Sequence, residues 1–284
     1  MNKKFWTGTI GCLITIICAA QPAAELKRFQ DKYPGEHVVT LHNDKSLDIS
    51  ITKSGELDVI RTVVEDRMYL NSKSAPLYSS DKISYSHFYE LGDINAYTDV
   101  PGEKKYAQVK VTTFVTKDEL SGSIFYDDVK SKSFFFPSLE AGSKTHLDYE
   151  TTITEPRFIT GFYFGSFGPL ESSICTITAD NDIELIFVYF NIDAEGLNFK
   201  KEVDKKRTTY TWSITEPQKF KREDNTPPSQ SYVPHIIPRI KSYTYKGKEI
   251  KILGDVTDLH NWYYDLIKDV NQEASKTLNL WLTH

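Results

Sequence analysis

Cys175 carries the strongest nucleophile of the chain outside its apolar N-terminal segment, because Cys12 and Cys18 both lie within that segment. Its setting, SSICTITAD, alternates between polar and apolar residues as a strand does. The glycine-rich or helix-start surroundings that lower the pKa of a catalytic thiol are missing from it. We therefore expect Cys175 to be an inert strand residue, and a single cysteine in the mature chain excludes an intrachain disulfide.

The histidines are the next candidates, as metal ligands or general bases. None of them forms a helical pair at metal-ligand spacing, and His37 and His42, five residues apart, would point to opposite faces of one strand. This pattern favours surface or edge positions, and we predict no metal site. The seven histidines are His37, His42, His87, His146, His235, His260 and His284.

Asp127 and Asp128 form an adjacent carboxylate pair that invites an acid–base or calcium interpretation. A calcium loop needs further oxygen ligands at alternate positions, and Val129, Lys130 and Lys132 do not supply them. A glycosidase pair could still be assembled from distant carboxylates. The chain has no G-x-S-x-G elbow and no glycine-rich phosphate loop. We therefore predict no catalytic residue and no cofactor.

Two further segments could bind a ligand. GFYFGSFG at 161–168 could form an aromatic platform for sugars or peptides, although packed strand residues are the commoner use of such aromatics. The basic run KKEVDKKR at 200–207 is typical of a solvated hairpin tip. The candidate aromatic binding face consists of Phe162, Phe164 and Phe167.

Strands must position all of these residues, because the dominant hydrophobic period is two. LDISITKSGELDVI alternates on both sides of Ser54-Gly55 and predicts a β-hairpin. Many short, aromatic and β-branched runs separated by turn residues favour an all-β fold, an antiparallel β-sandwich, over a parallel α/β fold. The further strand-like runs are 84–90, 107–116, 133–136, 145–152, 173–178, 183–191 and 208–214.

The C-terminus breaks this pattern. Steps of three and four between apolar residues predict an amphipathic helix over 258–284, with Thr257 or Asp258 as its N-cap. Four prolines between 225 and 238 predict an extended, proline-rich connector over 225–257. The apolar stripe of the helix either packs on the sandwich or docks a partner. The possible partner-docking residues are Trp262, Leu266, Val270 and Trp281.

An export signal is expected at the N-terminus. Lys3 and Lys4 precede an apolar run and small residues, which predicts a signal peptide over 1–20, possibly to 24, and not a stable membrane span. The β-sandwich domain then covers 25–224, and the protein is expected to be periplasmic or secreted. Cleavage changes the formal net charge from −5 to −7, which gives no electrostatic reason to expect nucleic acid as a partner.

The stretch SIFYDDVKSKSFFFPSLEAGSKTHLDYE at 123–150 resembles the signature of an uncharacterised domain of exported Bacteroidota-type proteins. That domain typically precedes a transglutaminase-like domain, and its pattern includes an aromatic strand ending in Pro and a turn ending in Gly-Ser. The segments 84–98, 209–214 and 258–267 also resemble it. The matching positions are Tyr126, Asp128, Pro137, Gly142, Ser143 and Tyr149.

No residue of this chain matches the catalytic Cys, His and Asp positions of the transglutaminase-like domain. The resemblance therefore implies an exported, non-catalytic module that binds a protein or substrate, with an unknown protein or cell-envelope ligand as its partner. The alternative is a truncated or fragmentary transglutaminase-like enzyme or peptidase whose catalytic domain is missing.

Overall fold

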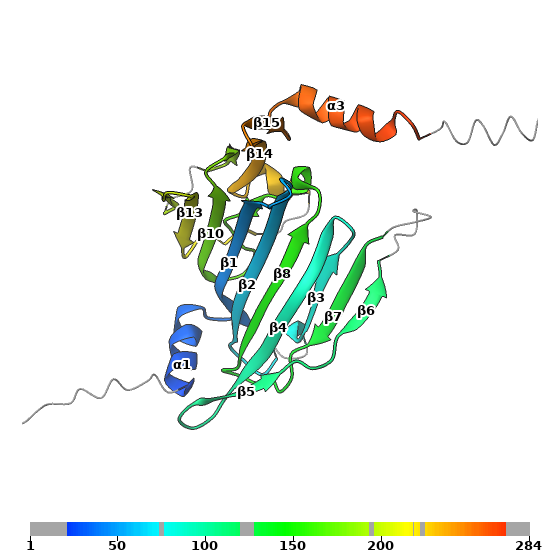
Figure 1. Cartoon of the computed structure of the whole chain (residues 1–284). Helices are drawn as coiled ribbons and strands as arrows, with labels where there is room; N and C mark the ends of the chain where they lie inside the picture. Colours follow the sequence, from blue (N-terminus) through cyan, green and yellow to red (C-terminus); the bar gives the residue numbers. More distant parts are fainter. Residues whose placement is uncertain are drawn as a thin grey trace, which may run out of the picture.

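The computed structural model describes residues 22–73, 77–119, 128–192, 196–217, 219–221 and 225–270. Its largest element is an eight-stranded sheet in the order β12-β13-β10-β1-β2-β8-β4-β5 (Figure 1). These strands are β1 (Val38–Ile51), β2 (Leu57–Tyr69), β4 (Tyr89–Pro101), β5 (Tyr106–Lys110), β8 (Lys144–Ile153), β10 (Leu170–Asp180), β12 (Asn198–Val203) and β13 (Arg207–Thr215).

Two smaller sheets pack against one face of the large sheet, each over a different part of it. One has the order β3-β7-β6, and the other has the order β11-β14-β15 with β9 also paired to β14. The all-β sandwich predicted from the sequence is thereby confirmed, together with its C-terminal helix. These strands are β3 (Ser80–Tyr85), β6 (Val115–Asp118), β7 (Lys130–Phe135), β9 (Phe162–Tyr163), β11 (Ile183–Phe190), β14 (His235–Tyr245) and β15 (Lys248–Lys251).

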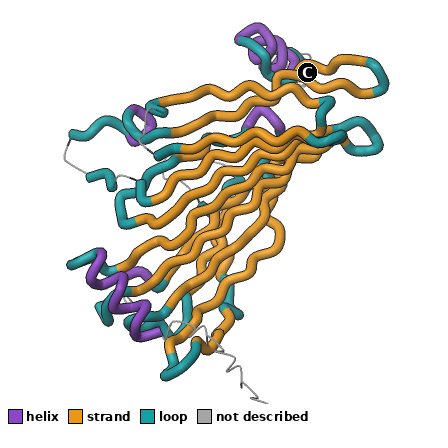
Figure 2. Tube along the Cα trace, turned by 90° about the vertical axis from the view of Figure 1, so that its left-hand side faces the viewer, coloured by secondary structure: helices purple, strands orange, loops and turns teal. Residues whose placement is uncertain are grey.

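Helices lie at the two ends of the stacked strands (Figure 2). Helix α1 lies at the strand ends near β5, and α3 lies at the opposite strand ends, next to β15 (Figure 1). The sequence pattern predicted a C-terminal helix over 258–284 and missed α1. The helix starts at Val256 and ends at Ile267, and residues 271–284 lie outside the described part of the chain. The bounds are α1 (Pro22–Lys32), η1 (Pro156–Phe158), η2 (Ser229–Ser231) and α3 (Val256–Ile267).

The predicted hairpin is present as β1 and β2, which pair antiparallel along their whole length. Gly55 in the turn has φ +94°, a left-handed conformation that glycine adopts without strain. A Cβ at Gly55 would lie 2.4 Å from the Tyr245 ring, so the close approach of β14 to this turn also requires glycine. Gly142, from the family signature, has φ +89° and reverses the chain before β8, as expected.

The strand predictions need two corrections. Strand β1 pairs parallel to β10, because the long excursion through 52–169 brings the chain back in the same direction. The run 107–116 is not one strand: the chain leaves the large sheet after Lys110 and joins the three-stranded sheet at Val115. Its continuous β-like composition gave no signal for that change of sheet.

The predicted connector 225–257 also needs correction, because β14 and β15 lie within it. Strand β14 pairs with β11 along its length, and Ile236 and Ile240 are fully buried. Pro238 is tolerated because β9 and β15 pair only with the two ends of β14, which leaves one side of Pro238 without a ladder partner. The division of the chain into domains remains a prediction.

Separate hydrophobic clusters hold the layers together. Trp212, Ile177 and Ile236 belong to the cluster between the large sheet and β11-β14-β15. Phe134, Ile83 and Leu147 belong to the cluster between β4, β8 and the three-stranded sheet. Leu147 and Tyr149 contribute to the same cluster, which confirms that they share one face of β8.

Candidate interaction site

Cys175 lies on β10 opposite Lys45 of β1 and is 2% exposed. Burial raises the pKa of the thiol, and the nearby Lys45 and Arg61 charges offset only part of this effect. Burial also lowers the pKa of Lys45, with a further contribution from the Arg61 charge. The prediction of a buried strand cysteine is confirmed, and a protonated, enclosed thiol is a poor nucleophile.

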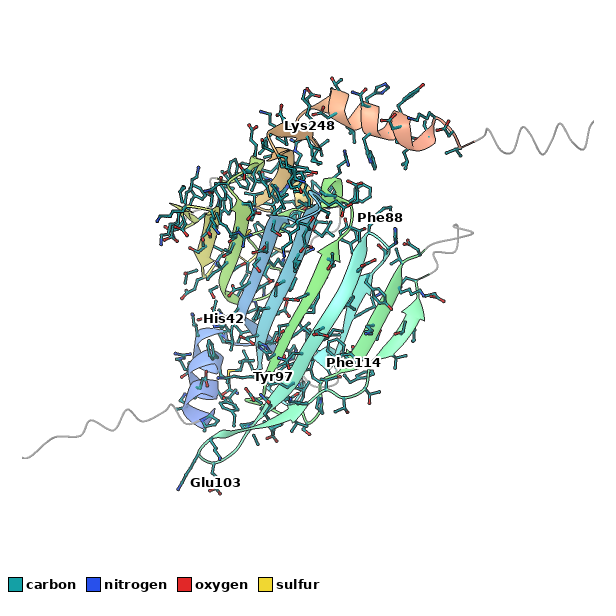
Figure 3. All side chains as sticks on the ribbon, viewed as in Figure 1. His42, Phe88, Tyr97, Glu103, Phe114 and Lys248 are labelled. Atoms are coloured by element: carbon teal, nitrogen blue, oxygen red, sulfur yellow. The ribbon has the colours of Figure 1, made fainter. Side chains whose placement is uncertain are left out.

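His146 is the histidine with the most specific surroundings. Its Nδ1 lies 2.6 Å from Asp66 Oδ1 and its Nε2 lies 2.8 Å from Asp148 Oδ2. Asn95 donates to the same Asp148 carboxylate, and the ring of Tyr97, which Figure 3 labels, stacks on the imidazole with 4.7 Å between centroids. The hydrogen bond to Asp66 is the main cause of the raised pKa of His146.

Sequence reasoning missed the environment of His146 because its partners come from three strands. Only the register places Asp66 of β2 and Tyr97 of β4 beside it, and no local spacing indicates that register. Among the described residues, no group of three or more His, Cys, Asp and Glu side chains is placed to hold a metal ion. The arrangement is a partly buried histidine held between two carboxylates on the sheet surface.

The two predicted charged segments have structural roles where they are described. Asp127 lies outside the described residues, and the Asp128 carboxylate accepts a hydrogen bond from the backbone N–H of His87. The run 200–207 forms the β12–β13 hairpin as expected. Its last residue, Arg207, is not merely solvated, because it donates two 2.8 Å hydrogen bonds to the Asp48 carboxylate.

The predicted aromatic binding face is wrong for two of its three residues. Phe162 is 2% exposed and Phe164 is 1% exposed, because both side chains fill the cluster between the large sheet and β14. A stacking platform needs accessible rings, so these two residues cannot form one. Phe167 is partly exposed, and its role as a ligand contact remains a prediction.

Helix α3 is rich in apolar residues that are not buried. Asp255 is its N-cap, two residues before the earliest predicted cap position, and its side chain accepts hydrogen bonds from the backbone N–H groups of Thr257 and Asp258 at 2.7 and 3.0 Å. Those bonds lower the pKa of the Asp255 carboxyl. The helix therefore starts in a regular, capped way.

No residue of α3 is buried. Leu266 is 61% exposed and Val270, just beyond the helix, is 65% exposed. Trp281, the last predicted docking residue, lies outside the described residues. The exposed apolar residues on one side of this segment, which we call the α3 face, are Leu259, Tyr263, Leu266 and Val270.

Trp262, at the border of this stripe, connects the helix to the body of the protein. Its ring meets the Phe158 ring edge-on at 5.8 Å between centroids, and the Arg157 guanidinium lies 5.3 Å from the Trp262 centroid. Trp262 is thus partly buried against η1, while the residues of the α3 face are exposed. The expectation that the stripe packs on the sandwich does not hold for these residues.

The predicted signal peptide, 1–20, lies outside the described residues, so the predicted export stays a prediction. None of the helices in the described part of the chain has the length and apolar character needed to cross a bilayer.

Comparison with known proteins identifies the domain type. Residues 61–221 match a family described as a domain of unknown function for which a solved structure exists. No curated protein shows significant similarity to the chain.

A similar fold occurs in the crystal structure of a protein from Parabacteroides distasonis that is provisionally assigned as a protease, with a TM-score of 0.60 and 16% identity. That alignment covers 71% of this chain and 40% of the Parabacteroides chain. An M1 zinc metallopeptidase from Deinococcus radiodurans aligns with a TM-score of 0.36 and 10% identity, covering 72% of this chain and 42% of its own. The chain thus spans less than half the length of these proteins, and at such identities the first likeness shows the fold alone.

Proposed function

The chain belongs to the DUF3857 family of domains of unknown function, and we propose that it is an exported, non-catalytic module that binds a transglutaminase-like protein domain through the α3 face. In this proposal the sandwich is a rigid support, and α3 is the element that meets the partner. The context is that of the exported Bacteroidota-type proteins that the signature at 123–150 resembles.

The observation that carries the proposal is the exposure of the α3 face. Leu259, Tyr263 and Leu266 lie on one side of a capped helix, Val270 follows in the turn after it, and all four are exposed. Burial of such a stripe in a partner's groove stabilises a complex by roughly 25 cal/mol per Å² of apolar surface removed from water. An amphipathic helix laid into an apolar groove is a common mode of protein recognition.

The charges of α3 favour a protein partner over a lipid surface. The helix and its caps carry the acids Asp255, Asp258 and Asp265 and one cation, Lys268, which is already paired with Asp265 at 2.9 Å. Helices that bind anionic membranes carry lysines and arginines on their polar side. The acidic polar side of α3 would be repelled by such a membrane.

The solved relative supports a partner that is a further folded domain. A fold of this kind makes up 40% of the Parabacteroides chain, so in that protein it is combined with other structure. That protein is provisionally assigned as a protease, which fits a non-catalytic module that accompanies a catalytic one. In our proposal, the α3 face of this chain occupies the corresponding junction.

The non-catalytic part of the proposal rests on the surroundings of the candidate groups. Cys175 is enclosed and its thiol pKa is raised by burial, and the His146 imidazole is bracketed by Asp66 and Asp148. Neither arrangement joins a nucleophile to a general base.

Site-specific photo-crosslinking in the native host tests the proposal. A photoreactive phenylalanine analogue replaces Leu266 or Tyr263, and the matched control replaces Tyr189, an exposed aromatic residue on β11. We expect the two α3 positions to crosslink to one protein with a transglutaminase-like domain, identified by mass spectrometry, and the control position to leave it uncaptured.

Three outcomes would contradict the proposal. Crosslinks to a second copy of the same chain would make α3 a dimer contact, and crosslinks to lipid would make it a membrane contact. The absence of any α3-specific product in cells that express the protein would remove the docking role.

A further inference from the structure

A second feature of the surface is a groove on the outer face of the β3-β7-β6 sheet. Ile83 and Phe134 point from this sheet into the core, and the groove lies mainly on the opposite face, walled at one end by residues 110–113. Its volume is about 740 Å³. Pockets for small ligands usually have volumes of about 300–1,000 Å³. Figure 3 labels Phe114, which marks the connection from β5 to β6 beside this wall.

The middle of the groove is apolar. Phe135 stands on the central strand β7 with 69% of its surface exposed, and Val115 on the neighbouring strand β6 is also exposed. Both residues line the same groove. Their exposed surfaces would be removed from water by an apolar body of modest size, which is favourable.

The rim of the groove is cationic. Lys82, Lys110 and Lys117 line it together with the single acid Asp81. Asp81 is paired with Arg67 at 3.1 Å, and Lys82 is paired with Glu119 at 3.0 Å. Within the described part of the chain, neither Lys110 nor Lys117 forms a direct ion pair, although the Lys117 charge contributes to the lowered pKa of Glu119. Both ammonium groups can therefore still meet a ligand, and Lys117 has one acidic neighbour.

We propose that this groove binds a small amphiphilic carboxylate, with its apolar body on Phe135 and Val115 and its anionic group at Lys110 or Lys117. The apolar centre alone would accept a neutral molecule equally well. These lysines supply the selectivity for an anion, because they attract a carboxylate and offer nothing to an alcohol. The groove belongs to the β3-β7-β6 sheet, whereas α3 follows β15 of the other small sheet. Ligand binding in the groove is thus separate from the proposed docking function.

Three probes separate the contribution of the apolar centre to binding from the contribution of the lysines. Octanoate has both the chain and the charge, 1-octanol has the chain alone, and acetate has the charge alone. Amide chemical shifts of the full mature protein report binding of each. We expect octanoate to shift resonances of 110–117 and 133–135 and to bind roughly fivefold more tightly than 1-octanol, as one or two exposed ion pairs allow. Acetate is expected to cause no saturable shift.

The variants test the same division. The double variant Lys110→Gln, Lys117→Gln is expected to reduce octanoate affinity to that of 1-octanol and to leave 1-octanol unaffected. Phe135→Ala is expected to weaken both probes. Matched controls are Lys104→Gln, next to Glu103 at the tip of the β4–β5 hairpin (Figure 3), and Phe199→Ala on β12, an exposed phenylalanine of the other end of the large sheet. Neither control is expected to change octanoate binding.

Equal affinity for octanoate and 1-octanol, or an unaffected lysine double variant, would overturn the assignment of charge selectivity. Shifts that map to the α3 face, or no saturable shift with octanoate, would overturn the site itself. Because the replaced side chains are at the surface, unchanged shifts of distant amides will confirm that each variant is folded.

Discussion

Helices α1 and α3 are both amphipathic, and α3 is the more apolar of the two. Yet α1 buries Phe29 to 3% exposure in a cluster with Val39, Met68 and Leu70, whereas α3 buries nothing. Polar contacts reinforce the difference. Lys32 of α1 pairs with Glu171 and Glu216, while Lys268 after α3 pairs with Asp265 of the same helix.

An amphipathic pattern indicates that a helix has an apolar face without indicating what covers that face. Helix α1 has few apolar residues, and they pack against an apolar cluster formed where β1 begins and β2 ends. Helix α3 has a broader apolar side and touches the sandwich at its border, through Trp262. The less apolar helix is therefore part of the fold, and the more apolar one is available for a partner.

The largest expected effect separates the two helices by stability. Phe29→Ala should lower the free energy of unfolding by about 3–5 kcal/mol, because it removes a buried aromatic ring and leaves a cavity. Tyr263→Ala and Leu266→Ala on the α3 face should change it by less than about 0.5 kcal/mol, because these residues are exposed. Urea denaturation of a chain spanning residues 21–284 measures all three. A loss above about 1.5 kcal/mol for either α3 variant would mean that the helix packs on the sandwich in solution.

A smaller effect concerns the charges. Burial by itself would raise the pKa of Glu171, but the hydrogen bonds from Lys32 and Tyr33 outweigh burial, and the net pKa is lowered. A lowered pKa in the folded state contributes stability that is present above the unfolded value of about 4.3 and is lost as the pH falls through the folded value.

Glu171→Gln should therefore cost no more than about 1 kcal/mol at pH 7, because solvent screens a partly exposed pair. The difference from wild type should vanish at acidic pH, below the folded pKa of Glu171. Asp265→Asn, which removes the exposed partner of Lys268, is the matched control and should have no measurable effect at either pH. Urea denaturation across this pH range measures the free energy of unfolding. If Glu171→Gln lowered it equally at every pH, the stability would not depend on ionisation of Glu171.

The sequence predicted the sandwich well because its strands alternate over several residues and its turns carry glycine at positions such as Gly55 and Gly142. It failed where tertiary context decides. The run 107–116 stays rich in β-branched residues, and only packing shows that Lys110 and Val115 lie in different sheets. Pro238 favoured a connector, but a strand tolerates it where one side lacks a ladder partner.

The candidate site divides in the same way. The apolar stripe with Trp262, Leu266 and Val270 follows from helical spacing. The exposure of Leu266 and Val270 depends on tertiary packing, which that spacing does not indicate. The groove at Lys110, Lys117 and Phe135 could not be predicted, because its residues come from separate segments and are joined by register. The buried state of Phe162 follows from its pairing with Ile236, which no local pattern in 161–168 indicates.

The attachment of α3 gives a third, local effect. Trp262→Ala removes the edge-on contact with Phe158 and the guanidinium contact of Arg157. An aromatic pair of this kind contributes about 0.5–1.5 kcal/mol, so hydrogen exchange of amides in 256–267 should accelerate roughly threefold to tenfold. Exchange in α1 should not change. Tyr264→Ala, an exposed aromatic residue of the same helix, is the control, and equal acceleration in both variants would mean that Trp262 does not anchor the helix.

The smallest effect lies at the start of α3. The Asp255 side chain accepts hydrogen bonds from two backbone N–H groups, which lower the pKa of its carboxyl. The stability that this ionised cap contributes is present above the unfolded value of about 3.9 and is lost as the pH falls through the folded value. Asp255→Ala should therefore fray the first turn of α3 at pH 7 without changing the urea midpoint, because no core residue depends on this helix.

Asp255→Asn keeps a capping oxygen without a titratable proton, so its first turn should be insensitive to acid. Amide exchange at 257–259 in the three proteins, at pH 7 and at pH 3, measures the difference. If Asp255→Ala lowered the urea midpoint as Phe29→Ala should, α3 would be coupled to the core, and the contrast between the two helices would fail. If only the first turn of α3 responds, the helix is an independently formed surface element, as a docking role requires.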